Sequence, residues 1–195
     1  NKLDLTVKGR VYCGIQDFTN KELHIQLEEN SHLIIEFLIS IENSKNKITI
    51  SNGENAKLDL HYACTYKGEN ELIVDSILAT SHNENRILIR AVEEEGTLIV
   101  KATGSIEHDT KDNVYVEDIK ALTNYNYSIK VMPDLIVKTD SVMATHNATI
   151  SPVDTEELFY LESKGLDKTH ATSLIKEGFL KGIVENEELK TGEVK

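Results

Sequence analysis

The most constraining feature of this chain is a long series of short β-type runs between residues 23 and 150. The runs alternate apolar and polar residues or are continuously apolar, β-branched residues dominate them, and none has helical spacing. They cover residues 24–27, 32–41, 47–50, 57–66, 72–79, 86–92, 98–102, 114–119, 127–137 and 142–150. Clusters of Asn, Gly, Asp, Ser and Glu separate them and are typical of turns. The sequence therefore predicts a mainly β domain.

Two β architectures accommodate such a series, an antiparallel sandwich or barrel and a β-helix whose coils stack on one another. Periodicity by itself favours the sandwich. Tight hairpin dipeptides are scarce, however, because Asn52-Gly53 is the only Asn-Gly or Asp-Gly in the chain. Asn55, Asn70 and Asn85 recur every 15 residues, each ahead of an apolar run. This spacing is a weak indication of a coiled repeat, and both architectures stay open.

The hydrophobic period changes near residue 152, where two helices are expected. Asp154, followed three residues later by a glutamate, is typical of a helix N-terminus, and Gly165 of a helix C-terminus. Asp167 can cap a second helix, which carries an apolar stripe at spacings of three and four. The stripe consists of Ala171, Leu174, Ile175, Phe179 and Ile183. We expect a β core over residues 1–151, less well defined over 1–22, a helical region over 152–185 and an acidic tail over 186–195.

Composition excludes several classes of function. The formal net charge is −12, from 33 acidic and 21 basic residues, so nucleic acid is not an expected partner. The longest apolar run, residues 33–41, is interrupted by Glu36 and is about half the length of a membrane helix, so no membrane partner is expected either. With two cysteines and no apolar leader, a reducing cytoplasmic location is expected.

Four blocks at the end of the chain resemble a known family. They are His-Asn-Ala-Thr-Ile over 146–150, Glu-Leu-Phe-Tyr-Leu over 157–161, Ser-Lys-Gly over 163–165 and Gly-Phe over 178–179. In order and spacing they are similar to the C-terminal signature of the SufB/SufD family, the scaffold proteins of the SUF iron–sulfur cluster assembly system. Lys164 departs from that signature, which usually has arginine there. The resemblance implies a right-handed parallel β-helix with a small C-terminal α-helical cap, and it reverses the preference for a sandwich.

The resemblance also implies candidate ligands for a transient iron–sulfur cluster, with no intrinsic cofactor expected. His146 matches the family histidine and is either an iron ligand or a structural cap of the last coil. Glu117 lies near the position of a cysteine in the SufB branch, and a carboxylate can also ligate iron. Asn147 is neutral where SufB often has an acidic residue, so this pair of positions is more SufD-like. Cys64 is a further candidate ligand, with a small buried thiol as the alternative interpretation.

The helical end is the expected partner site. Four consecutive apolar residues exceed what one face of a short helix can bury, so they are either sandwiched within the chain or await a partner. The expected docking residues are Leu158, Phe159, Tyr160, Leu161, Gly165 and Phe179. The resemblance implies a SufC-like ABC-type ATPase at this end, and a second copy or a SufB/SufD-like subunit at an edge of the β-helix. The chain itself has no phosphate-binding glycine loop, so ATP hydrolysis is expected in the partner and the chain is expected to be a non-catalytic scaffold.

A carbohydrate-binding or carbohydrate-cleaving β-solenoid or β-sandwich is the alternative function. Such a protein needs a groove with exposed aromatic side chains or paired carboxylates. With no tryptophan and four phenylalanines, stacking on sugars is poorly supported.

Overall fold

The computed structural model describes residues 1–123 and 128–191, which form ten β-strands followed by three helices. The strands are β1 (Lys2–Val7), β2 (Arg10–Ile15), β3 (Glu22–Leu27), β4 (His32–Glu42), β5 (Lys45–Asn52), β6 (Lys57–Leu78), β7 (Glu84–Ile106), β8 (Asn113–Leu122), β9 (Ile129–Val137) and β10 (Val142–Ser151). The helices are α1 (Thr155–Ser163), α2 (Lys168–Lys181) and α3 (Glu187–Thr191). The prediction of a mainly β domain is confirmed.

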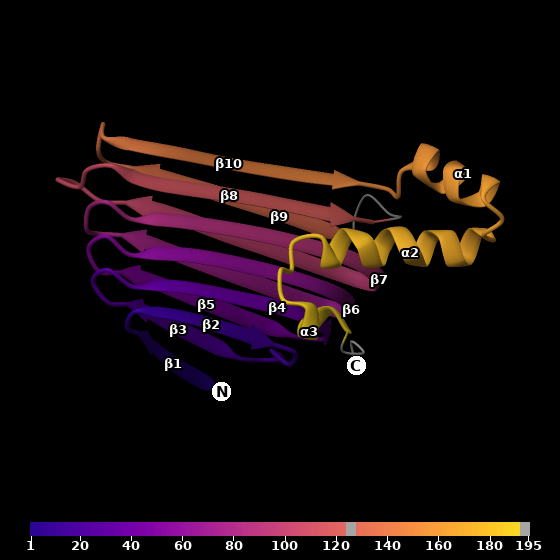
Figure 1. The fold of residues 1–195 in the computed structure, drawn as a ribbon, viewed down its shortest axis with the longest axis horizontal. Coiled ribbons are helices and arrows are strands. Elements are labelled where there is room, and N and C mark those ends of the chain that lie inside the picture. The colour runs from indigo at the N-terminus through magenta and orange to yellow at the C-terminus, as the bar shows by residue number, and fades with distance from the viewer. Residues whose placement is uncertain (124–127, 192–195) are drawn as a thin grey trace.

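The strands form a parallel β-solenoid of about five turns (Figure 1). One stack contains β2, β4, the first half of β6, the first half of β7, β8 and β10. The other contains β1, β3, β5, the second halves of β6 and β7, and β9. All of these ladders are parallel. The sandwich favoured by periodicity is therefore wrong, and the parallel β-helix implied by the family resemblance is confirmed.

Two predicted turns are corners within long strands. The sequence predicts breaks near residues 67–70 and 93–96, but β6 and β7 run through both and bend from one stack into the other. Gly68 and Gly96 lie side by side at this corner with φ of +71° and +121°, which non-glycine residues rarely adopt. A Cβ on Gly96 would lie 2.2 Å from the Gly68 carbonyl oxygen. Glycine is therefore required where two coils turn in contact.

Stacked asparagines satisfy the backbone at the turns. The Asn113 side chain accepts a hydrogen bond from the Asn83 backbone, and that of Asn83 accepts one from Ala56. The Asn55 side chain also donates to the Asn30 side chain of the preceding turn, from one side chain to the other. Strand registers place equivalent residues 20 to 31 positions apart, so the 15-residue asparagine spacing is not the coil repeat. Asparagine ladders of this kind satisfy the turns of a solenoid, in which tight hairpin dipeptides are not needed.

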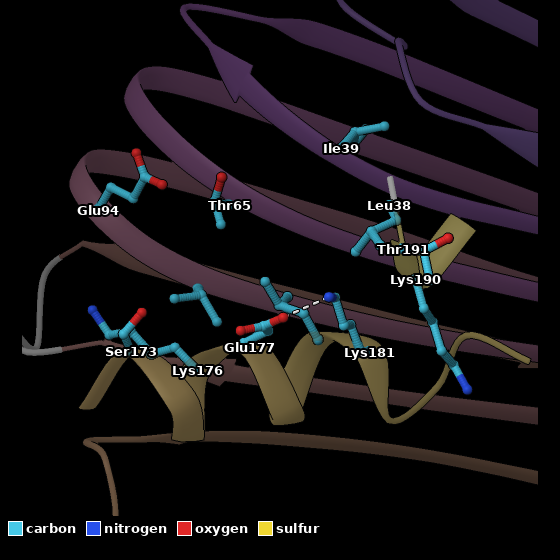
Figure 2. Close-up of a pocket in the computed structure, with 12 residues that line it drawn as sticks. Leu38, Ile39, Thr65, Glu94, Ser173, Lys176, Glu177, Lys181, Lys190 and Thr191 are labelled. Carbon is cyan, nitrogen blue, oxygen red and sulfur yellow. Dashed lines mark hydrogen bonds and ion pairs between the residues drawn. The ribbon is translucent and has the colours of Figure 1, made fainter. Parts of the chain in front are cut away.

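Both predicted helix starts are confirmed. The Asp154 carboxylate accepts from the backbone of Glu156 and Glu157, and the Asp167 carboxylate caps α2 in the same manner. In Figure 1 the chain leaves β10, forms α1 and α2, and returns across the strands toward β4. Figure 2 shows α2 beside the outer face of the sheet. The helices therefore lie along the side of the solenoid, and the edges of β9 and β10 form its open end.

An apolar cluster holds this helical region on the sheet, and it extends into the predicted acidic tail, where α3 forms. The cluster comprises Leu38, Ala63, Val92 and Leu122 from the sheet with Leu180, Val184 and Leu189 from the helical region. Of the predicted stripe on α2, Ala171 is buried while Leu174 is 49% exposed. None of the described helices is long and apolar enough to span a lipid bilayer.

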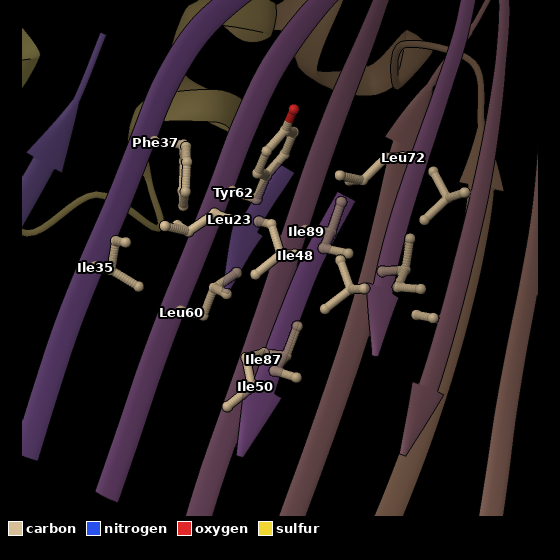
Figure 3. Packing of buried hydrophobic residues seen from close by; sticks show 14 of the residues in the cluster. Leu23, Ile35, Phe37, Ile48, Ile50, Leu60, Tyr62, Leu72, Ile87 and Ile89 are labelled. Atoms are coloured by element: carbon tan, nitrogen blue, oxygen red, sulfur yellow. The ribbon is translucent and has the colours of Figure 1, made fainter. Parts of the chain in front are cut away.

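Rows of aliphatic side chains fill the interior of the solenoid (Figure 3). Parallel pairing in register places one residue from each coil at the same position, so identical side-chain types stack. Ile35, Leu60 and Ile87 form one such row on β4, β6 and β7, and all three are fully buried. In this row the next two coils carry other residue types.

Candidate functional site

Polar residues replace the apolar row at the open end. The position of Ile35, Leu60 and Ile87 is occupied by Glu117 on β8 and by His146 on β10. Glu117 is 1% exposed, whereas His146, on the last coil, is exposed. The structure thus brings together two of the residues that the sequence singled out, one directly above the other.

The Glu117 carboxyl group is only half satisfied. Its Oε2 accepts a hydrogen bond of 2.7 Å from the Tyr115 hydroxyl, while its buried Oε1 has no partner among the described residues. Burial raises the pKa of this carboxyl group, although the Tyr115 hydroxyl and the His146 imidazole act in the opposite direction. Burying a carboxylate oxygen without a hydrogen-bond partner lowers the free energy of unfolding. The buried Oε1 of Glu117 therefore suggests a function for this residue.

The Tyr115 side chain extends from β8, the strand that also carries Glu117, to Gly104 on the opposite sheet. A Cβ on Gly104 of β7 would lie 2.5 Å from the Tyr115 ring carbon that bears the hydroxyl. Glycine at this position therefore leaves the room that the ring occupies. Tyr115 is not among the residues that the sequence singled out; a polar aromatic residue two positions before the candidate ligand was the available signal.

On the outer face, a polar chain connects the last coil to α2. Asn147 donates to Asp118 at 2.9 Å, and Arg90 forms an ion pair with the other oxygen of Asp118 at 2.5 Å. The Arg90 guanidinium lies 5.9 Å from the centre of the Phe179 ring. Burial opposes ionisation of Asp118, but Asn147 and Arg90 outweigh it and lower its pKa. Asn147 and Phe179 are therefore tied into the solenoid itself.

Cys64 is not part of this site. It lies on β6, three coils before β10, and is fully buried in the apolar core. Burial raises the pKa of its thiol to about 12, which disfavours the thiolate that binds metals. The structure therefore favours the alternative interpretation of Cys64 as a small buried thiol.

The four apolar residues of α1 divide into two pairs. Leu158 and Leu161 are half-buried, whereas Phe159 and Tyr160 are 73% and 60% exposed. Gly165, at φ +96°, follows the end of α1. No residue of α1, which is described in full, is buried. Phe159 and Tyr160 thus form an aromatic surface on the helical region.

The described residues supply too few donors to enclose a metal ion. Among them, no three His, Cys, Asp or Glu side chains converge closely enough to hold one. His146 and Glu117 offer an imidazole and a carboxylate oxygen, both suited to iron, at an edge that a second chain could complete.

A family model described as "SUF system FeS cluster assembly, SufBD core domain" matches residues 16–179. The chain belongs to the SufBD family. It is 29% identical over 140 residues to an iron–sulfur cluster assembly protein SufD of Escherichia coli, which covers 67% of this chain and 32% of that protein. It is 25% identical over 178 residues to a SufBD family protein of Methanocaldococcus jannaschii, which covers 89% of this chain and 46% of the relative. A SufD protein of Bacillus subtilis is 32% identical over 104 residues, 52% of this chain and 24% of that protein.

This SufBD chain thus spans less than half the length of each of these relatives. The match includes the His146 and Glu117 strands and most of α2. Family membership connects the chain with iron–sulfur cluster assembly in the SUF system.

Proposed function

We propose that this chain is a scaffold subunit that holds iron, or a nascent iron–sulfur cluster, at the open end of its solenoid. The observation that carries the proposal is that His146 is the register partner of Glu117, whose buried Oε1 has no partner among the described residues. Iron is cargo in this proposal, bound on arrival and passed on. The imidazole would act as an exposed first ligand, and the carboxylate as a second donor from the coil beneath.

Further ligands would come from a second subunit, either another copy or a related SufBD chain. Among the described strands, β9 and β10 each have one edge without a paired strand, and apolar side chains are exposed on them. These are Met132, Ile136 and Val137 on β9 and Met143 and Ile150 on β10. A partner strand on this edge would bury them and bring its own donors to His146.

An ABC-type ATPase would dock on the aromatic surface of α1 and supply ATP hydrolysis. Phe159 and Tyr160 are exposed there, and an adjoining groove of about 680 Å³ between α1, α2 and the end of β10 is lined by Pro152, Val153 and Ile175 among others. The carbohydrate alternative has less support. The exposed aromatic side chains among the described residues are Tyr12 on β2 and this pair on α1, so they form no row along the solenoid.

The test is anaerobic incubation of the purified chain with ferrous iron and sulfide, followed by desalting and measurement of bound iron. We expect the parent protein to retain iron and His146→Ala to retain several-fold less. His108→Ala removes an exposed histidine in a turn and serves as the matched control. Equal iron in the parent and His146→Ala would refute the site. A parent that retains none would indicate a purely structural subunit.

A further inference from the structure

We propose that Tyr115, seated on Gly104, is a positioning residue that turns Glu117 Oε1 toward the iron site. This inference rests on the proposed function. Tyr115 binds only Oε2, at 2.7 Å, and so uses one carboxylate oxygen while the other is left without a partner. If hydrogen bonds occupied both carboxylate oxygens, the buried charge would be fully satisfied, but no oxygen would remain free to bind iron.

The seat of the ring determines this geometry. Tyr115 is 1% exposed and its ring lies against the bare backbone of Gly104, which belongs to the opposite sheet. The tyrosine therefore spans the interior of the solenoid from β8 to β7. Gly104 packing fixes the Tyr115 ring, and the Tyr115 hydroxyl binds Glu117 Oε2. The Glu117 carboxyl group therefore has one preferred orientation.

Ferrous iron affinity, measured anaerobically by equilibrium dialysis without sulfide, tests this role. Tyr115→Phe keeps the ring and removes the hydroxyl, and we expect affinity to fall about tenfold, as for other outer-shell partners of metal ligands. Tyr62→Phe is the matched control, because Tyr62 is also a buried tyrosine whose hydroxyl bonds a side chain, that of Asn46 at 3.3 Å. An equal effect of the two variants, or no effect of either, would overturn the inference.

A double-mutant cycle separates positioning from general damage. If Tyr115 acts through Glu117, Tyr115→Phe should have no further effect in a Glu117→Gln background. Additive losses would contradict the role. Binding that survives His146→Ala would instead refute the proposed function, so the two failures are distinguishable.

A separate feature carries a second inference, which does not depend on iron. The buried carboxylate of Glu36 on β4 accepts hydrogen bonds from the backbone N–H groups of Glu185 at 2.6 Å and Asn186 at 3.1 Å. It also accepts from the Tyr12 hydroxyl at 2.7 Å and the His61 imidazole at 3.1 Å. Four donors from three parts of the chain thus converge on one side chain that is fully buried.

We infer that residues 182–191 are a strap that Glu36 fastens to the early coils of the solenoid. Beyond the fastening point, Leu189 lies against Gly14 of β2, where an added Cβ would come within 2.9 Å of it. The strap covers outward apolar side chains of the sheet, among them Leu38 and Ala63. It therefore joins the early coils to the helices that follow the last coil.

A groove of about 450 Å³ borders the strap. Leu38 and Val92 of the sheet and Lys190 and Thr191 of the strap line it, and Figure 2 shows Leu38, Lys190 and Thr191. Release of the strap would merge this groove with the surface it covers into one exposed apolar strip. The strap is thus a conformational device whose position determines how much of the sheet is accessible.

Hydrogen exchange of the full chain, read by mass spectrometry, tests the strap. Glu36→Gln removes the charge that four donors share, and we expect amide exchange over residues 182–191 to accelerate at least about tenfold. Exchange in β6 and β7 should stay unchanged. Glu42→Gln, an exposed position on the same strand, is the control. Unchanged exchange in the strap, or an equal rise throughout the solenoid, would overturn the inference.

Tyr12→Phe provides a second variant, because Tyr12 is 43% exposed and its loss leaves the carboxylate and the other donors in place. We expect a smaller acceleration confined to the same segment. The dye 1-anilinonaphthalene-8-sulfonate reports exposed apolar surface, and its binding should rise several-fold in Glu36→Gln. No rise would show that the apolar face stays covered and would contradict the strap.

Discussion

His146 on β10 is the register partner of Glu117 on β8, in a row that is apolar in the preceding coils. The pair is separated by 29 positions in sequence, so only coil stacking brings the imidazole above the carboxylate. Burial of an unpartnered carboxylate oxygen opposes folding. The buried carboxylate therefore lowers folding stability while providing a candidate iron ligand, and substitution of Glu117 measures both effects.

Glu117→Gln should stabilise the metal-free protein. At neutral pH the amide avoids burial of a charge and can still accept the Tyr115 hydrogen bond, so we expect a gain on the order of 1 kcal/mol in the free energy of unfolding by urea. Bound iron should fall in the same variant. A loss of stability would show that the ionised carboxylate is satisfied in the folded protein.

Phe159→Asp should abolish capture of a SufC-like ATPase while leaving the fold intact. Phe159 is 73% exposed, so we expect its replacement to change stability by less than about 0.5 kcal/mol. Capture on an affinity resin should drop at least about tenfold, because a charge would enter an apolar interface. Ile77→Asp, at a 41% exposed position on the solenoid, is the control. Undiminished capture by Phe159→Asp would remove the docking proposal.

The contribution of Glu36 should depend on pH. Burial by itself disfavours its charge, but the Glu185 backbone, the Tyr12 hydroxyl and the His61 imidazole outweigh burial and hold the pKa below the usual value. Tyr12 on β2 and His61 on β6 are the titratable groups bonded to this carboxylate. Because the folded pKa is the lower one, the stabilisation is complete above the unfolded pKa of about 4.3 and is lost as pH falls through the folded pKa.

Urea unfolding of the parent and of Glu36→Gln across pH measures this contribution. The difference in unfolding free energy should favour the parent near neutral pH and shrink as the pH falls below about 4. A difference that stays constant over this range would show that the charge of Glu36 plays no part.

Cys64→Ser should destabilise the protein without affecting iron. A hydroxyl in the apolar interior lacks a partner, and we expect a cost of about 1–3 kcal/mol in thermal or chemical unfolding. Cys64→Ala is the milder control for volume. Bound iron should match that of the parent in both variants, and a drop in either would return Cys64 to the set of candidate ligands.

Gly96→Ala should be among the most damaging small substitutions. Its Cβ would meet the Gly68 backbone at 2.2 Å, whereas a Cβ on Gly9, which also has a positive φ of +68°, meets nothing within 4 Å. We expect a loss of about 2–4 kcal/mol for Gly96→Ala and about 1 kcal/mol for Gly9→Ala. Similar losses would mean that backbone conformation alone, and not coil contact, accounts for the requirement.

Local features of the fold could be predicted from the chain because their causes are local. Asp154 and Asp167 each cap a helix through bonds to residues two or three positions away. The strand positions follow from alternation and from the polar turns. The corners at Gly68 and Gly96 were predicted as breaks, because a turn and a bend within a strand have the same composition.

The candidate site was predictable only in part. His146 and Glu117 were singled out through a family resemblance, and their contact depends on the register of β8 and β10. The part played by Tyr115 and Gly104 depends on two sheets facing each other, which no local pattern reports. The fastening of Glu36 to Glu185 joins residues 149 positions apart and had no signal in sequence beyond a charge within an apolar run.

The sequence by itself determined that this chain is mainly β, where its helices begin and which family it resembles, since hydrophobic period, capping residues and short motifs act over a few neighbouring positions. Only the tertiary structure decided that the strands pair in parallel, that the helices lie along the side of the solenoid and that a half-satisfied carboxylate lies under an exposed histidine. The physical reason is that coil stacking pairs residues 20 to 31 positions apart, and burial and hydrogen bonding across those pairs select one arrangement.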